Sequence, residues 1–158
     1  MKILALSNRA DILYRMSFRI HTVGTVRRDD SGAFLDLDPA YLDALRGLDG
    51  FSHVTILYWF DRNDTPEKRR TLLVHPRNDP ANPLTGVFAT RSPRRPNLLG
   101  MDTARLISVK GNRVRIDGTD ALDGTPVIDL KPYIPVSDAF PEAAVPEWVP
   151  ESGDDDDG

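Results

Sequence analysis

The chain has 158 residues and no cysteine, which excludes disulfides, thiolate metal sites and cysteine nucleophiles. Apolar residues make up 40% and charged residues 28%, a balance typical of a soluble globular domain. The formal net charge of −4 excludes a uniformly basic surface for nucleic acid. No apolar run approaches the roughly 20 residues of a membrane helix, and the histidines lack metal-ligand spacing. We therefore expect a cytoplasmic protein that uses neither a membrane nor a metal.

The first part of the chain predicts two strands and a helix. Residues 18–26 alternate apolar and polar side chains and predict a half-buried strand, and a second strand follows at 33–37 after a turn. A capping residue followed by proline predicts a helix over 39–45. We expect Leu42 and Leu45 on the buried side of that helix.

The run at 51–60 is the strongest strand in the sequence. Because it is almost continuously apolar, we expect both of its faces to be covered. Within it we interpret Tyr58 and Trp59 as core residues, and His53 as a core histidine rather than a base. Another strand is predicted at 71–75, before a long proline-rich loop.

The later part of the chain predicts further short strands. A strand at 86–90 leads into an arginine-rich loop, and 99–109 and 113–117 flank a glycine-containing turn typical of a β-hairpin. A turn at 120–126 precedes a buried strand at 127–130. This series of short strands predicts a mainly β fold, a small barrel or sandwich with one or two short helices. The sequence has neither βαβ repeats nor a GxGxxG motif, which argues against a Rossmann fold.

The ends of the chain are interpreted separately. The first fifteen residues have too short an apolar stretch for a signal peptide, so they form either an added strand or an extension before a true start at Met16. We divide the chain into an N-terminal extension over 1–17, a barrel domain over 18–140 and a proline-rich acidic tail over 141–158.

Two segments carry candidate binding chemistry. The first, 86–100, reads GVFATRSPRRPNLLG and places three arginines among hydroxyl and amide side chains. Guanidinium groups bind carboxylates and phosphates through paired donors, although a solvated arginine loop stays open as an alternative. The second, 123–133, reads DGTPVIDLKPY, in which Asp123 can accept from ribose hydroxyls or an ammonium group. Its alternative is a structural turn with a surface pair of Asp129 and Lys131.

These two segments carry a family resemblance. VFATRSPRRPN, followed about 25 residues later by DGTPVIDLKPYIP, resembles the TrmO/TsaA (YaeB-like) family of S-adenosylmethionine-dependent tRNA methyltransferases, and GFSHVTILYWF is similar to that family's central strand. The resemblance covers about residues 18–137. It implies a small closed or partly open β-barrel, a homodimer, and S-adenosylmethionine bound without a Rossmann sheet. It also implies methylation at N6 of threonylcarbamoyladenosine next to the tRNA anticodon.

The resemblance also implies positions for the site residues, and it names no catalytic group. The cofactor contacts fall on Asp61, Arg62, Arg91, Met101, Asp123, Gly124, Thr125 and Pro126. The substrate side falls on Arg94, Arg95, Asn97, Lys131 and Tyr133. This assignment requires the arginine-rich loop and the 123–126 turn to converge around one cofactor.

The chain departs from the family pattern at three places. The PRQ motif expected after the first strand is absent, since that region reads TVRRDDSGAF. Asp61-Arg62 stands where relatives have His-Gln or His-Lys, and RPNPIGLS is replaced by RPNLLGMD. Two alternatives to tRNA methylation therefore stay open, namely methyl transfer to a small molecule and a non-catalytic module that binds S-adenosylmethionine.

Overall fold

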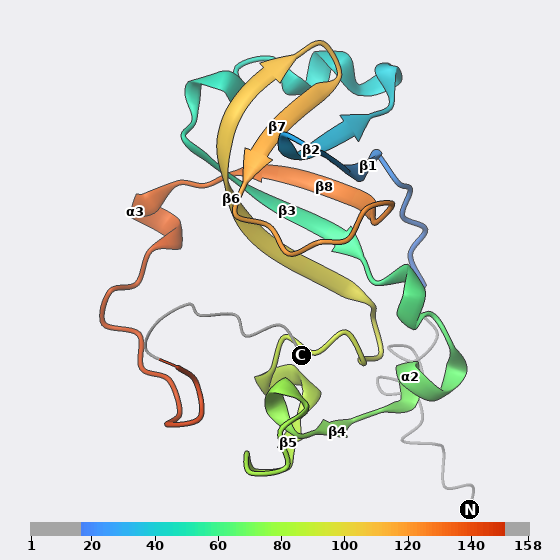
Figure 1. Ribbon diagram of the computed structural model, residues 1–158, viewed down its shortest axis with the longest axis vertical. Coiled ribbons are helices and arrows are strands. Elements are labelled where there is room, and N and C mark those ends of the chain that lie inside the picture. Colours follow the sequence, from blue (N-terminus) through green and yellow to red (C-terminus); the bar gives the residue numbers. More distant parts are fainter. Residues whose placement is uncertain (1–16, 151–158) are drawn as a thin grey trace, which may run out of the picture.

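The computed structural model describes residues 17–150, and within them six antiparallel strands close into a barrel. Around the barrel the order is β1 (Gly24–Asp29), β2 (Gly32–Leu37), β7 (Arg113–Asp117), β6 (Leu99–Lys110), β3 (His53–Trp59) and β8 (Pro126–Pro132), which pairs again with β1. The barrel is the upper body of the molecule in Figure 1. Closure pairs the two edge strands of the sheet with each other. The predicted mainly β fold is confirmed, and the barrel is closed.

Two hairpins of the barrel follow the predicted turns. In the β1–β2 hairpin, the backbone N–H and the hydroxyl of Ser31 both donate to Oδ1 of Asp29, at 2.9 and 2.6 Å. In the β6–β7 hairpin, Gly111 adopts a φ of +58°, which a glycine tolerates at no steric cost. Both turns are specified by residues within them, which is why the sequence predicts them well.

The first strand begins later than predicted. We expected a strand over 18–26, but β1 begins at Gly24 and residues 18–22 are exposed. The ladders that β1 forms with β2 and with β8 both start at Gly24. Val23 still forms backbone hydrogen bonds with Val127 and Asp38, but residues 18–22 have no ladder to join in the described structure, and a strand needs a partner as well as a pattern.

The core of the barrel is formed by inward-facing residues that alternate along each strand. In β3, Val54, Ile56 and Tyr58 are buried, whereas the residues between them are only partly covered. The prediction that both faces of 51–60 are covered is wrong, because a barrel strand turns one face to the core and the other outward. Tyr58 is a core residue as predicted, whereas Trp59 lies on the outward face.

The predicted helix is observed as a 3₁₀-helix, η1 (Pro39–Leu45). Asp38 caps it as predicted, since its side chain accepts from a backbone N–H of the first turn at 2.9 Å. Leu45 is buried in the core, but Leu42 is 45% exposed, so its predicted burial is wrong. The helix contacts the core cluster through Leu45 at its last residue. A second 3₁₀ turn, η2 (Leu48–Gly50), then leads toward β3.

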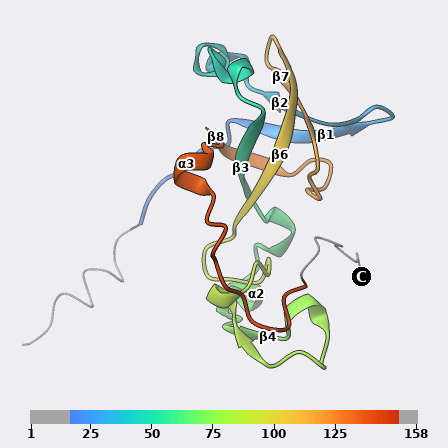
Figure 2. The ribbon, with the colours of Figure 1, turned by 90° about the vertical axis from the view of Figure 1, so that its left-hand side faces the viewer.

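Between β3 and β6 the chain leaves the barrel and forms an extension of residues 61–98, seen below the barrel in Figures 1 and 2. Its elements are η3 (Asp61–Asn63), α2 (Pro66–Arg70), β4 (Leu73–Val74), η4 (Pro76–Asn78), β5 (Thr85–Gly86) and η5 (Val87–Ala89). The strand predicted at 71–75 is therefore shortened to β4, and the strand predicted at 86–90 is wrong beyond Gly86, because η5 follows directly. Because β4 and β5 pair only with each other in the described structure, no larger sheet prolongs them.

The C-terminal part follows β8 with a short helix, α3 (Pro135–Asp138), and then a segment without helix or strand up to residue 150. The interpretations of residues 1–16 and of the last acidic residues lie outside the described residues. No helix within residues 17–150 is long and apolar enough to cross a membrane.

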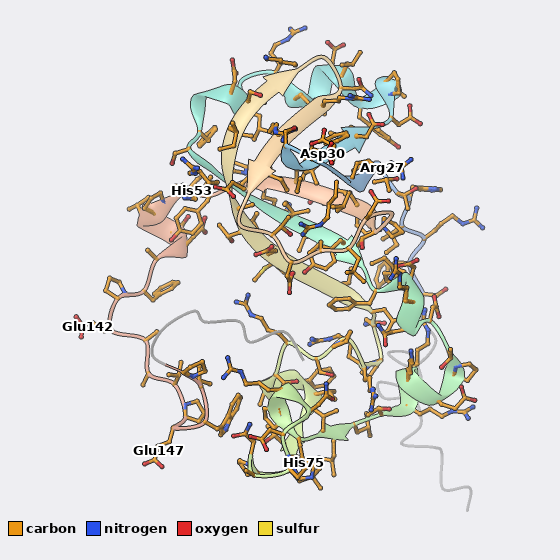
Figure 3. All side chains as sticks on the ribbon, viewed as in Figure 1. Arg27, Asp30, His53, His75, Glu142 and Glu147 are labelled. Carbon is orange, nitrogen blue, oxygen red and sulfur yellow. The ribbon has the colours of Figure 1, made fainter. Side chains whose placement is uncertain are left out.

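His53 and His75 lie in different parts of the fold. Figure 3 shows His53 beside the barrel and His75 low in the extension. His53, predicted as a core residue, is half-buried at the start of β3, where its Nδ1 lies 2.9 Å from the Ser52 hydroxyl. The described residues contain no group of three histidine, cysteine or acidic side chains that could hold a metal ion.

Candidate functional site

A cavity of about 610 Å³ lies where the barrel meets the extension. Four segments line it: the end of β3 with η3, the arginine-rich loop, the start of β6, and the loop that precedes β8. These segments are far apart in the sequence, and the return of the chain from the extension into β6 brings them together (Figure 1). The size of the cavity is within the usual range for small-molecule sites.

Gly100 allows the aromatic part of the cavity to form. It pairs with Tyr58 across β3 and β6, and a Cβ at Gly100 would overlap the Tyr58 ring and lie 2.8 Å from Cζ of Phe60. The rings of Tyr58 and Phe60 pack edge to face, with centroids 5.5 Å apart. Burial is the main cause that raises the pKa of the Tyr58 hydroxyl, and the nearby carboxylates of Asp120 and Asp102 raise it further. The hydroxyl therefore stays protonated at neutral pH.

The loop that precedes β8 is held in place by β1. Arg28 donates from Nε to the Ala121 carbonyl at 2.9 Å and from Nη2 to the Thr119 carbonyl at 2.6 Å. The backbone of Arg28 also donates to Oδ1 of Asp123 at 3.0 Å. Gly124 adopts a φ of +87°, and its N–H donates to a backbone carbonyl of β1 at 2.9 Å. The wall formed by this loop is therefore fixed from the first strand of the barrel.

Asp123 connects the loop to two other arginines. Its carboxylate lies 3.6 Å from Arg27 in an exposed ion pair, and its carbonyl accepts from Arg62 Nη2 at 3.4 Å. Figure 3 shows Arg27 beside β1, on the far side of the barrel from His53. Because Arg62 follows β3, its contact with Asp123 joins two walls of the cavity.

A second network fixes the extension against the barrel. Arg69 binds the carboxylate of Asp64 through two donors, at 2.7 and 3.0 Å, and its Nη1 donates to the Pro96 carbonyl at 3.1 Å. Trp59 donates from Nε1 to Asp64 at 3.2 Å, and the Arg69 guanidinium stands 5.3 Å from the Trp59 ring centroid. The hydrogen bonds from Arg69 and then Trp59 hold the pKa of Asp64 below its usual value. The network positions the arginine-rich loop, and sequence reasoning missed it.

The arginine-rich loop is shaped by its hydroxyl side chains. Thr90 Oγ1 accepts from the N–H of Ser92 at 3.2 Å, and Ser92 Oγ accepts from the N–H of Arg94 at 3.2 Å. Arg95 turns back onto the loop, where its Nη1 donates to the carbonyls of Thr90 and Ser92 at 3.4 and 3.3 Å. Arg91 and Arg94 are exposed.

The structure brings part of the predicted site together. The predicted residues that line the cavity are Asp61, Arg62, Arg91, Arg95, Met101 and Thr125. Asp123, Gly124 and Pro126 belong to the same wall without lining the cavity, and Arg94 and Asn97 lie in the arginine-rich loop just outside the lining.

Lys131 and Tyr133 lie elsewhere. Lys131 pairs with Asp129 at 2.8 Å on β8, and the N–H of Tyr133 donates to the carbonyl of His53 at 3.1 Å. Both sit toward the start of β3, whereas the cavity opens at its end. Neither residue lines the cavity.

Sequence reasoning also missed residues of the cavity. Tyr58, Phe60, Gly100, Asp102 and Asp120 all line it. Gly100 and Asp102 carried a signal, because a glycine and a carboxylate in alternate positions of a strand interrupt the apolar pattern on one face. Oδ2 of Asp102 is buried and has no hydrogen-bond partner among residues 17–150.

Known proteins resemble this chain over most of its length. It is 45% identical over 115 residues to a probable S-adenosyl-L-methionine-binding protein of Pyrococcus horikoshii, covering 73% of this chain and 82% of the relative. It is 47% identical over 91 residues to a tRNA (adenine(37)-N6)-methyltransferase of Mus musculus, covering 58% of this chain and 20% of that protein.

The crystal structure of TrmO from Pseudomonas aeruginosa has the same fold, with a TM-score of 0.64 and 30% identity. The match covers 82% of this chain and 62% of that one, so this chain spans less than two thirds of the Pseudomonas protein. Residues 15–139 match the family model of the tRNA-methyltransferase O N-terminal domain. The resemblance read from the arginine-rich loop and the 123–133 segment is thereby confirmed, and the chain belongs to the tRNA-methyltransferase O family.

Proposed function

We propose that this chain is an S-adenosylmethionine-dependent methyltransferase that acts on N6 of threonylcarbamoyladenosine next to the tRNA anticodon. The observation that carries the proposal is the convergence of the arginine-rich loop, the end of β3 and the loop before β8 on one cavity. Family membership supports the reaction class. The homodimer and the cytoplasmic location stay predictions.

The residues of the cavity fit the cofactor. S-adenosylmethionine has a carboxylate, two cationic groups, a ribose and a purine. Arg62 and Arg91 would hold the carboxylate, because guanidinium groups bind carboxylates through paired donors. Apolar surface from Phe60, Leu99 and Leu122 suits the purine. The buried carboxylate oxygen of Asp102 suits a cation, since a buried charge without a partner is unfavourable.

The cofactor supplies a methyl group activated by its sulfonium. Displacement at that methyl group needs alignment more than a covalent nucleophile, and holding donor and acceptor in line contributes on the order of 7–11 kcal/mol. The chain supplies this alignment through rigid walls: β1 fixes the loop before β8, and the Asp64–Arg69 pair fixes the arginine-rich loop.

The RNA side of the proposal rests on the arginines outside the cavity. Arg94 is exposed on the loop that also provides Arg91 to the cavity, so a phosphate bound there lies beside the cofactor. Contacts with phosphate weaken steeply with added salt, because binding releases counterions from the RNA. Binding of tRNA that is unaffected by salt would contradict this role of Arg94.

The test incubates the protein with methyl-labelled S-adenosylmethionine and bulk tRNA. The label should enter RNA, and mass spectrometry of the digested nucleosides should place it on threonylcarbamoyladenosine. tRNA from cells that lack the threonylcarbamoyl modification is the control substrate and should stay unlabelled. Label only in a small-molecule fraction would favour a small substrate, and binding without transfer would favour a non-catalytic module.

A matched pair of variants tests the cofactor site itself. Arg91→Ala should weaken S-adenosylmethionine binding at least tenfold by calorimetry, because Arg91 lines the cavity. Arg46→Ala removes an exposed arginine whose partner, Asp43, is remote from the cavity, and it should leave the affinity unchanged. Equal affinities for the two variants would contradict the assignment of Arg91.

A further inference from the structure

Asp102 places a carboxylate on the inner face of the barrel wall. It pairs with Ile56 across β3 and β6, and its neighbours on the same face, Gly100 and Ala104, pair with Tyr58 and Val54. Residues directly opposite each other on antiparallel strands point to the same face. Because Ile56, Tyr58 and Val54 are buried core residues, Asp102 also faces inward, between two small residues.

This carboxylate has neither a hydrogen-bond partner for its buried oxygen, Oδ2, nor an ion-pair partner among residues 17–150. Asp102 as a whole is half-buried, but its buried oxygen carries charge without a partner, and such a carboxylate in a binding cavity is suited to a cationic ligand.

The charges that surround Asp102 are mixed. Asp120 and Arg91 also line the cavity, and both act electrostatically on Tyr58 together with Asp102. Asp120 adds negative charge and Arg91 opposes it. Arg91 is the group that suits the carboxylate of the cofactor, which leaves the inward-facing Asp102 for a positive charge.

We propose that Asp102 is the counter-charge of the sulfonium of S-adenosylmethionine, and that it lets the cavity distinguish the methyl donor from its demethylated product. The inference rests on the proposed function. A sulfonium carries a permanent charge but has no N–H to donate, so it needs a nearby anion rather than an aligned acceptor. The side chain of Asp102 supplies such an anion on the apolar inner wall.

The charge disappears when the methyl group is transferred. The C–S bond breaks and its electron pair stays on sulfur, which becomes a neutral thioether, while the acceptor nitrogen forms the N–C bond and releases its proton to water. Asp102 then loses its attraction for the ligand, which favours release of the product.

The experiment compares three ligands by calorimetry. S-adenosylmethionine carries the sulfonium, sinefungin carries an ammonium in its place, and S-adenosylhomocysteine is neutral there. Asp102→Asn keeps the shape and removes the charge. We expect about tenfold weaker binding of the two cationic ligands, equivalent to about 1.4 kcal/mol, and a change below twofold for S-adenosylhomocysteine. Asp129→Asn, a carboxylate on β8 outside the cavity, is the control and should change none of the three.

A second measurement does not depend on any ligand. Because the unmatched charge destabilises the chain alone, Asp102→Asn should raise its melting temperature by about 2–4 °C, and saturating S-adenosylmethionine should reduce or reverse that difference. Asp102→Ser should show the same selective loss of the cationic ligands. Equal loss for all three ligands, or no loss, would overturn the inference. A wild-type protein that binds none of them would overturn the proposed function as well, whereas binding without methylation of tRNA would overturn the proposed function alone.

Discussion

Arg28 connects the first strand to the loop that forms one wall of the cavity, and its removal gives the sharpest test of how that wall is held. In Arg28→Ala, the two hydrogen bonds from the guanidinium to the carbonyls of Thr119 and Ala121 are lost, while the backbone N–H still donates to Asp123. Hydrogen bonds from a charged donor contribute about 1.5–3 kcal/mol each when buried. Arg28 is exposed, so we expect a combined loss of about 1–3 kcal/mol.

The loss should appear both in stability and in binding. Urea unfolding measures the change in the free energy of unfolding, and calorimetry measures the affinity for S-adenosylmethionine. Since binding must then order the loop again, we expect the affinity to fall by about five- to fiftyfold, equivalent to about 1–2.3 kcal/mol. A stable variant with unchanged affinity would show that the loop does not depend on Arg28.

Arg27→Ala is the matched control, because it removes the neighbouring arginine of the same strand. Its guanidinium forms a half-exposed ion pair with Asp123 at 3.6 Å, and such pairs contribute about 0–1 kcal/mol. We expect nearly unchanged stability and affinity. If Arg27→Ala and Arg28→Ala have the same effects, net charge rather than the two hydrogen bonds explains them, and the reasoning is refuted.

Three further substitutions test the packing and the charges around the cavity. Gly100→Ala should destabilise the fold by about 1–3 kcal/mol in urea unfolding, because the added methyl group overlaps the Tyr58 ring; an unchanged midpoint would mean that the ring moves freely. Gly124→Ala should cost about 1–2 kcal/mol, because its φ of +87° is unfavourable for alanine, and a neutral result would contradict this backbone geometry. The bonds from Arg69 lower the pKa of Asp64, so their stabilisation is present above about pH 4 and is lost as the pH falls through the lowered pKa. The stability difference between wild type and Asp64→Asn should therefore shrink between pH 5 and about pH 2 in thermal melts, and a constant difference would refute the ion pair.

Features that depend on residues adjacent in the sequence were predictable from the sequence. The glycine turn at Gly111, the cap at Asp38 and the presence of a strand at β3 all follow from local patterns, whereas the alternate burial along β3 does not. The family motifs were recognisable for a related reason, since the arginine-rich loop and the 123–133 segment are continuous in sequence. Asp61, Arg62, Arg91 and Thr125 line one cavity, and their contacts with the cofactor stay a prediction.

Other features depended on which segments meet in the fold. The alternation before Gly24 failed to form a strand because the ladders begin at that residue, and Leu42 stayed exposed because η1 meets the core at Leu45. Lys131 comes only a few residues after the 123–126 turn in the sequence. It lies on β8 beside the first half of β3, whereas the cavity lies at the end of β3. Sequence proximity alone did not place these residues.

The sequence by itself determined the strands with strong local patterns, their turns, and the two motifs that identify the family. Only the tertiary structure decided that Arg28 would brace a loop more than 90 residues away, and that Asp102 would face the inside of the barrel. The physical reason is that turn and capping preferences act over a few residues, whereas hydrogen bonds and charges across a closed barrel depend on strand register. That register is fixed only when all the strands have paired.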